Sequence, residues 1–189
     1  MKTGSYLIFA VCALFNSCVF SDAQVVWLST RNMDFTDCDR EERQVKEFAG
    51  IRNTCPFDVI YEQSDEQYVI VEGDEEYFGR LHTDVSKGIL EISIDPARYR
   101  NVRLRVKVGS PEISHISMSG SGSIFCKTDI EADGELTIKV SGSGDISAEN
   151  IGCDILESSV SGSGEIKVSY IDADKVNVSV TGSGDWDAD

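Results

Sequence analysis

One four-residue phrase recurs at nearly even spacing in the C-terminal part of this 189-residue chain. It is written Ser-Gly-Ser-Gly from Ser119, Ser141 and Ser161, and Thr-Gly-Ser-Gly from Thr181, in steps of 22, 20 and 20 residues. A fixed period near 20 is typical of stacked repeats, in which each unit buries its apolar edge against the next. This phrase therefore constrains the fold more than any other feature of the sequence.

A short stretch of alternating apolar and polar residues follows each phrase. Alternation with a period of two predicts a β-strand with one face buried. A second stretch in each unit, such as Val176 to Val180, is rich in β-branched residues and predicts another strand. The apolar members of the first stretch fall in two inward columns: Ile124, Ile146, Ile166 and Trp186, and then Cys126, Ala148, Val168 and Ala188.

Two strands and two corners per unit return the chain displaced by one strand spacing, about 4.8 Å. Glycine suits such corners because it adopts positive φ without a Cβ penalty. The predicted fold is all-β: a right-handed parallel β-helix solenoid of ~20-residue repeats. We expect repeat coils over 119–189, the last of them incomplete, and an irregular capping β region over 43–118 that has room for a helical turn near Glu75 to Leu81.

The start of the chain has the pattern of an export signal. Lys2 precedes an apolar run from Tyr6 to Phe15, and Ser21 and Ala23 place small residues where a signal peptidase reads. We expect a signal peptide over 1–23 and a spacer over 24–42. The apolar run is shorter than the ~20 residues of a membrane-spanning helix.

These features predict an exported protein that is periplasmic, secreted or held at the outer-membrane surface. A competing interpretation makes Cys18 a lipid-modified N-terminus, although Phe15-Asn16-Ser17 is a poor lead-in for lipid attachment. The formal net charge of −16 and a pI near 4.4 disfavour nucleic acid and anionic membranes as partners, because both would be repelled. Cations and basic surfaces are more suitable partners.

Three stretches carry a resemblance to a known family. They are Arg43-Gln44-Val45-x-x-Phe48-x-x-Ile51, then Val69-x-Val71-Glu72-Gly73-Asp74-Glu75, and then Val106-x-Val108-x-x-Pro111-x-Ile113-x-x-Ile116 leading into the first Ser-Gly-Ser-Gly phrase. In this order they resemble the putative auto-transporter adhesin, head GIN domain family of Bacteroidetes surface proteins, over Arg43 to Asp189. The resemblance implies a secreted or lipid-anchored β-helix with no catalytic residues to carry over.

Cysteines are the first candidates for chemistry. Cys126 and Cys153 align with small apolar residues of other repeats, which favours a place in the core. Cys38 and Cys55 lie in the irregular half and are candidates for a disulfide in an oxidising compartment, with unpaired thiols as the alternative. No Cys-x-x-Cys spacing occurs, so no zinc site is predicted.

Acidic residues also align in two columns. Stacked carboxylates about 5 Å apart repel one another, and a bound Ca²⁺ would relieve this repulsion. The alternative, which the 20-residue period favours, is solvated acidic edges, with no metal and no cofactor bound. The two columns are Asp145, Glu165 and Asp185, and Asp133, Asp154 and Asp174.

Basic residues concentrate in one predicted strand. They form a candidate ligand face for an acidic glycan or for a partner's acidic segment, and the alternative is that they pair with acidic strands carrying Glu72 to Glu76 or Glu91. The histidines His82 and His115 are isolated and indicate no catalytic triad. The basic residues of this face are Arg98, Arg100, Arg103, Arg105 and Lys107.

The function predicted from these patterns is a non-enzymatic, adhesin-like interaction module that contacts glycan or a surface protein. The alternative is a carbohydrate-active β-helix enzyme of the polysaccharide lyase or hydrolase type. Glycoside hydrolysis needs two carboxylates ~5–10 Å apart in a concave site, whereas the repeats spread similar acids evenly. Because the last coil is incomplete, we also expect self-association through the C-terminal coil.

Overall fold

The computed structural model describes residues 34–188, and these form an all-β fold with one short 3₁₀ helix. The signal peptide predicted for 1–23, Cys18 and the spacer residues up to 33 lie outside the described residues. Between residues 34 and 188 no helix is long and apolar enough to cross a membrane. The helical turn predicted near Glu75 is confirmed by the 3₁₀ helix η1.

The elements follow one another closely along the chain. They are β1 (Asp39–Glu42), β2 (Gly50–Asn53), β3 (Asp58–Gln63), β4 (Tyr68–Gly73), η1 (Glu75–Arg80), β5 (Leu81–Ser86), β6 (Ile89–Ile94), β7 (Leu104–Ser110), β8 (His115–Met118), β9 (Ser123–Cys126), β10 (Ile130–Val140), β11 (Asp145–Gly162), β12 (Glu165–Gly182) and β13 (Asp185–Ala188). Part of the predicted spacer thus contributes a strand, β1.

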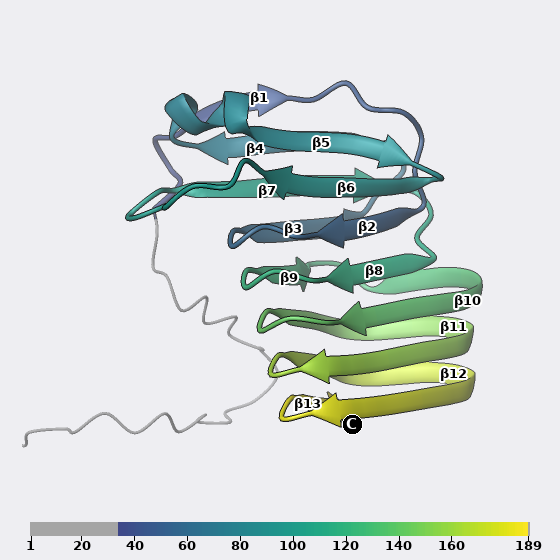
Figure 1. Cartoon of the computed structure of the whole chain (residues 1–189). Helices are drawn as coiled ribbons and strands as arrows, with labels where there is room; N and C mark the ends of the chain where they lie inside the picture. Colours follow the sequence, from purple (N-terminus) through teal and green to yellow (C-terminus); the bar gives the residue numbers. More distant parts are fainter. Residues whose placement is uncertain (1–33, 189) are drawn as a thin grey trace, which may run out of the picture. The chain divides into compact units, whose positions relative to one another are not determined.

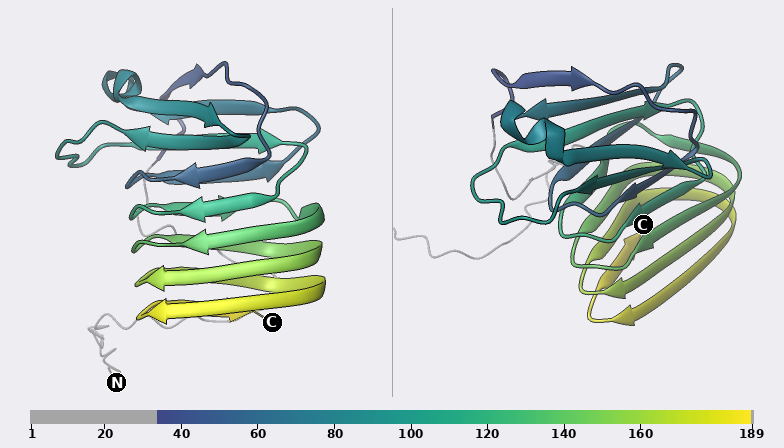
Figure 2. Two further views of the ribbon diagram at one scale, coloured as in Figure 1. Left: turned by 45° about the vertical axis from the view of Figure 1, so that its right-hand side comes forward. Right: turned by 45° about the horizontal axis from the view of Figure 1, so that its top comes forward.

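All thirteen strands belong to one mixed sheet. One arm of the sheet has the order β1-β4-β7-β3-β9, the long strands β11 and β10 form the bend, and the second arm returns as β8-β2-β6-β5. Strand β12 pairs with β11, and β13 pairs with β12. Figures 1 and 2 show the two arms facing each other, so the described residues form a sheet curled into a half-barrel.

The parallel β-helix solenoid predicted from the sequence is therefore wrong as the fold class. The N-terminal strands do not cap a separate stack, because β2 and β3 bond directly to β8 and β9 in the same sheet. Strands β1, β4 and β5 run antiparallel to their neighbours. The 20-residue period describes only the parallel pairing of neighbouring strands, and it does not extend to the residues that complete the curled sheet.

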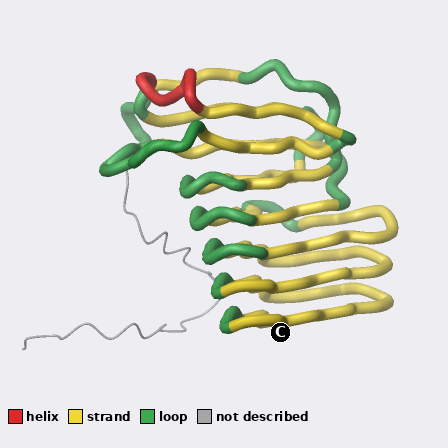
Figure 3. The backbone as a smooth tube through the Cα atoms, in the orientation of Figure 1, coloured by secondary structure: helices red, strands yellow, loops and turns green. Residues whose placement is uncertain are grey.

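Within the C-terminal part, neighbouring strands pair in parallel at the spacing of the repeated phrase. Ile146 lies opposite Ile166, which in turn lies opposite Trp186. Strands β11 and β12 each run unbroken for 18 residues. Each includes both strands that the sequence predicted for one unit and the bend between them, as Figure 3 shows.

The core lies between the two arms and consists of the inward side chains of both. Ile124, Ile146 and Ile166, which the sequence placed in one inward column, are at most 1% exposed. Ile51 and Ile116, on strands β2 and β8 of the other arm, are equally buried. Burial of apolar side chains at this scale, about 1.5–3 kcal/mol for each large residue, is the main stabilising contribution to such a fold.

The glycines of the repeated phrase are required mainly because neighbouring backbones approach closely. A Cβ added to Gly144 would lie 2.2 Å from the Gly122 carbonyl oxygen, and one added to Gly164 would lie 2.0 Å from that of Gly144. Among the phrase glycines only Gly162 and Gly182 have a positive φ, 139° and 111°. The positive φ expected from the sequence thus explains glycine at two positions. At the other positions, the close approach of neighbouring atoms explains it.

Candidate functional site

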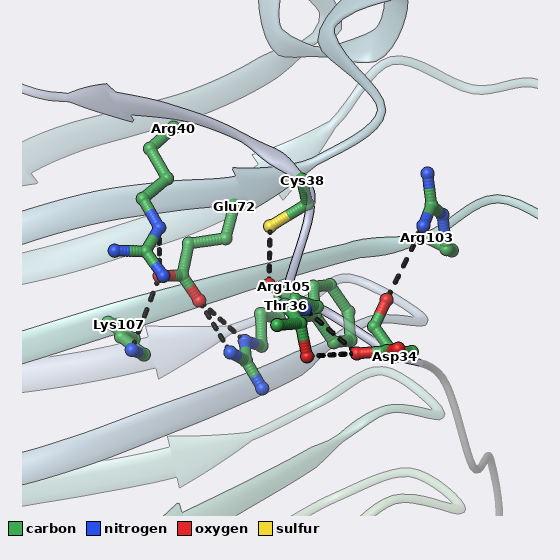
Figure 4. Close-up of polar contacts among 9 residues, drawn as sticks. Asp34, Thr36, Cys38, Arg40, Glu72, Arg103, Arg105 and Lys107 are labelled. Atoms are coloured by element: carbon green, nitrogen blue, oxygen red, sulfur yellow. Dashed lines mark hydrogen bonds and ion pairs between the residues drawn. The ribbon is translucent and has the colours of Figure 1, made fainter.

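A cluster of charged side chains lies where β1, β4 and β7 are adjacent. The antiparallel register of β4 and β7 places Glu72 opposite Arg105, and that of β1 and β4 places Arg40 opposite Glu72. Lys107 follows two residues after Arg105, on the same side of β7. Figure 4 shows the carboxylate of Glu72 between these three cations, which we call the Glu72 cluster.

Both carboxylate oxygens of Glu72 are occupied. Arg105 donates to Oε2 from Nε and Nη2, each at 2.7 Å. Oε1 lies 3.1 Å from Arg40 Nε and 3.2 Å from Lys107 Nζ, and the side chain is only 1% exposed. Burial by itself would raise the pKa of Glu72, but the hydrogen bonds and charges of Arg105 and Lys107 outweigh burial and lower the pKa below its ordinary value.

The segment before β1 closes over one side of the cluster. The ring of Phe35 lies 4.0 Å from the Arg105 guanidinium carbon, within cation–π range. Arg103 donates to the backbone oxygen of Asp34, and its side chain also forms an ion pair with Asp74 at 3.1 Å. The cluster therefore ties β1 and the chain before it to the sheet.

The five basic residues predicted as a ligand face do not lie on a single strand. Arg103, Arg105 and Lys107 contact Glu72 and Asp74, which belong to the acidic stretch that the sequence offered as the alternative partner. Arg98 and Arg100 lie in the loop before β7 and are exposed. As a ligand face, the five residues stay a prediction.

The cysteines of the described chain are all free thiols. Cys38 Sγ donates to the backbone oxygen of Phe35 at 3.1 Å, and Cys55 is buried. The predicted disulfide between Cys38 and Cys55 is not formed in this structure and stays a prediction for the exported chain. Burial raises the pKa of Cys55 and of Cys126 to about 12, so neither thiol is a ready nucleophile near neutral pH.

The histidines occupy separate parts of the fold. His82 is an exposed residue of β5, and its Nε2 lies 2.9 Å from Asp95 Oδ1. His115 is the first residue of β8, and its Nε2 is buried without a hydrogen-bond partner. Burial, followed by the charges of Lys139 and Arg52, lowers the pKa of His115, which keeps its imidazole neutral.

Within residues 34–188, no three His, Cys, Asp or Glu side chains come close enough together to hold a metal ion. Asp145, Glu165 and Asp185 are exposed on neighbouring strands, and Glu165 N donates to Asp145. We expect these acids to act as solvated edges. EDTA should therefore shift the melting temperature by about 1 °C or less, measured by circular dichroism; a large drop that Ca²⁺ restores would contradict this.

Two shallow hollows meet on the outer face of the second arm and the long strands. The first, about 420 Å³, is lined by Ala49, Gly50, Lys87, Gly88, Ile89, Ser114, His115, Glu135 and Thr137. The second, about 380 Å³, is lined by Glu135, Thr137, Lys139, Glu157, Ser158, Ser159, Asn177, Val178 and Ser179. Because they share Glu135 and Thr137, they form one path, which we call the strand-face groove. The sequence did not single out this groove, since its residues are spread over 131 positions and none forms a motif.

Comparison with known proteins identifies the family. Residues 47–189 match the family described as "Putative auto-transporter adhesin, head GIN domain". The chain belongs to this family. The resemblance seen in the sequence from Arg43 onward is thus confirmed for residues 47–189. No curated protein matches this head GIN domain chain.

Solved structures share the fold of this head GIN domain chain. A putative adhesin from Parabacteroides distasonis ATCC 8503 is 23% identical with a TM-score of 0.73, covering 80% of this chain, which spans 64% of that protein. A putative adhesin from Bacteroides fragilis NCTC 9343 is 18% identical with a TM-score of 0.52, covering 82% of this chain and 98% of that one. A putative lipid binding protein from Parabacteroides distasonis ATCC 8503 is 20% identical with a TM-score of 0.52, covering 82% and 97%. At these identities the likeness shows the fold alone.

Strand β12 leaves an apolar edge exposed in this head GIN domain chain. Strand β13 covers only Glu165–Val168 of β12, and in the described chain no strand pairs with β12 on that side after Val168. Val176, Val178 and Val180 are 42%, 42% and 46% exposed. Apolar strand edges of this kind pair readily with other chains.

We therefore expect the exported chain to self-associate through β12. In an antiparallel pairing centred on Val178, Val176 lies opposite Val180 and no like charges face each other between residues 174 and 182. Val178→Lys should shift the chain toward monomer in light scattering over a concentration series, because it places a charge at the centre of the edge. Ser179→Lys adds the same charge at an outward position and should not; a wild-type monomer at all concentrations would contradict self-association.

Proposed function

We propose that this chain is a non-enzymatic, exported surface module that binds glycan through its strand-face groove. The observation that carries the proposal is the composition of this groove. In-register pairing places Thr137, Glu157 and Asn177 side by side across three strands. Lys139, Ser159 and Ser179 form the next row.

Hydroxyl, amide and charged groups in rows are suited to a ligand that presents many hydroxyls. Each row offers donors and acceptors at successive strand spacings of about 4.8 Å, similar to the length of one sugar residue. The groove is lined by no Phe, Tyr or Trp side chain. We therefore expect weak binding at each sugar residue and useful affinity only for an extended chain or for many copies of the module.

The family context supports a binding role. The family is that of a putative auto-transporter adhesin, and two of the solved structures that share the fold are putative adhesins. An adhesin must lie outside the cell to reach its ligand. The export pattern at the start of the chain predicts this location. The buried, protonated thiols of Cys55 and Cys126 further favour binding over catalysis.

A glycan array probed with the exported chain tests this proposal. Ser159→Tyr adds a bulky side chain to the groove, and Ser147→Tyr adds the same side chain on β11 outside the groove. We expect array signals that Ser159→Tyr abolishes and Ser147→Tyr retains, with no shortened product after incubation with the bound glycan. Signals unaffected by Ser159→Tyr, or release of cleaved sugar, would overturn the proposal.

A further inference from the structure

The Gly50 end of the strand-face groove differs from the rest of it, because one position in its row has no side chain. Gly50 pairs with Ile89 on one side and with His115 on the other. A Cβ on Gly50 would meet Ile89 Cγ1 at 3.1 Å and His115 Cβ at 3.2 Å. The glycine therefore keeps open a hollow of about 420 Å³, within the ~300–1,000 Å³ range of small-molecule sites.

Cationic groups gather around this hollow on a chain whose net charge is −16. Lys87 lines it from the turn between β5 and β6, and Lys139 of β10 lines the adjoining part of the groove. In the described part of the chain neither lysine forms an ion pair, whereas Arg52 donates to Glu91 at 2.7 Å. Glu135 and Glu157 are the acids along the groove, and Glu135 accepts from the Thr137 hydroxyl.

His115 lines the hollow and makes it sensitive to charge. Its Nε2 is buried and has no hydrogen-bond partner, an arrangement that is destabilising for a polar atom. Lys139 of β10 and Arg52 of β2 are the charges that act on its imidazole, and Glu135 and Lys87 line the same hollow. Glu91 of β6 forms an ion pair with Arg52. An anion bound here would offset the repulsion from Lys139 and Arg52 and favour the imidazolium form.

We propose that this hollow binds the carboxylate of an acidic sugar residue, with Lys87 of its lining as the cationic partner and Lys139 adding positive charge from the adjoining part of the groove. The hydroxyls of Ser114 and Thr137 line the same hollow and are suited to the sugar's own hydroxyls. Ile89 is the one large apolar side chain of the lining, which favours a sugar over the side chains of a peptide. The inference rests on the proposed glycan binding by the groove and specifies the chemical class of one sugar residue.

Titration of the exported chain with D-glucuronate and with D-glucose tests this inference, with NMR of the His115 ring as the readout. Glucuronate should bind and raise the pKa of His115, while glucose, which lacks the carboxylate, should leave the pKa unchanged. Binding should therefore strengthen as the pH falls through the pKa of His115 in the glucuronate-bound chain, while glucuronate stays ionised. An unchanged His115 pKa at saturating glucuronate would overturn the inference.

Substitution of the lysines separates this site from the rest of the surface. Lys87→Gln should weaken glucuronate binding about tenfold through loss of one charge-assisted contact. Lys167→Gln, on β12 outside the groove and paired with Asp187, is the matched control and should leave binding unchanged. Equal loss in both variants would show nonspecific attraction and overturn the inference.

Two further outcomes distinguish this inference from the proposed function. Suppose that neutral oligosaccharides bind in a way that depends on Ser159, while glucuronate has no effect on the pKa of His115. This result would overturn the acidic-sugar site but not glycan binding by the groove. Loss of all sugar binding would sink both. A tetraglutamate peptide that binds as tightly as glucuronate and raises the His115 pKa equally would also overturn the sugar assignment, in favour of an acidic protein partner.

Discussion

Replacing Ile166 with aspartate is expected to unfold the C-terminal part of the half-barrel. Ile166 is fully buried on β12, between Ile146 and Trp186 in the neighbouring strands. An unpaired carboxylate at this position would cost several kcal/mol, because nothing in the core can replace its hydration. This cost is a large fraction of the ~5–15 kcal/mol that stabilises a typical domain. Urea denaturation followed by circular dichroism measures the loss.

A matched substitution at an outward position controls for the added charge. Ser147 lies on β11 opposite Lys167, one residue after the buried Ile146. Ser147→Asp should change the free energy of unfolding by about 0.5 kcal/mol or less, since its carboxylate remains solvated near a lysine. If Ile166→Asp were as stable as Ser147→Asp, the inward and outward assignment of β12 would be wrong.

The register tested by these variants could be predicted from the sequence, whereas the fold class could not. Alternation and a fixed step of 20 residues place Ile146 and Ile166 in one column, because pairing residues of parallel strands share a face of the sheet. How the sheet continues beyond the periodic part depends on pairings such as Gly50 with His115, 65 residues apart. No local pattern describes such a pairing, so the N-terminal strands were expected to form a separate cap.

Ser158 illustrates how a long-range contact corrects a local pattern. It lies in an inward column between Ile138 and Val178, yet it carries a hydroxyl and is 4% exposed. The indole Nε1 of Trp186 donates to Ser158 Oγ at 2.9 Å, which satisfies both polar groups. The sequence placed Trp186 in an inward column, but only the structure shows that its indole reaches a buried serine one strand further away.

The charged residues of the candidate site could likewise be predicted only in part from the sequence. Alternation predicted that Arg103, Arg105 and Lys107 share one side of a strand, and the acidic stretch from Glu72 was one of the partners considered. That Glu72 takes three cations at once depends on β1 and β7 lying on opposite sides of β4. The strand-face groove is less predictable still, because Gly50 contributes to it through the absence of a side chain.

Replacing Glu72 with glutamine is expected to destabilise the fold by about 1–3 kcal/mol at pH 7. The substitution keeps the shape of the side chain but leaves Arg40, Arg105 and Lys107 without their shared counter-ion. The expected loss is smaller than the ~3–5 kcal/mol of a fully buried ion pair that loses one partner, because the three cations themselves remain partly exposed. Glu42→Gln, at an exposed position on β1, is the control and should be nearly neutral.

The pH dependence of this difference tests the electrostatic explanation. Because the pKa of Glu72 in the folded chain lies below the ordinary value of 4.5, the unfolded chain binds more protons between the two pKa values. The stabilisation is therefore fully present above pH 4.5 and is lost as the pH falls through the folded pKa. The difference in free energy of unfolding between the wild type and Glu72→Gln should shrink in acid; a difference that stays constant down to the folded pKa would show that lost packing, and not charge, is responsible.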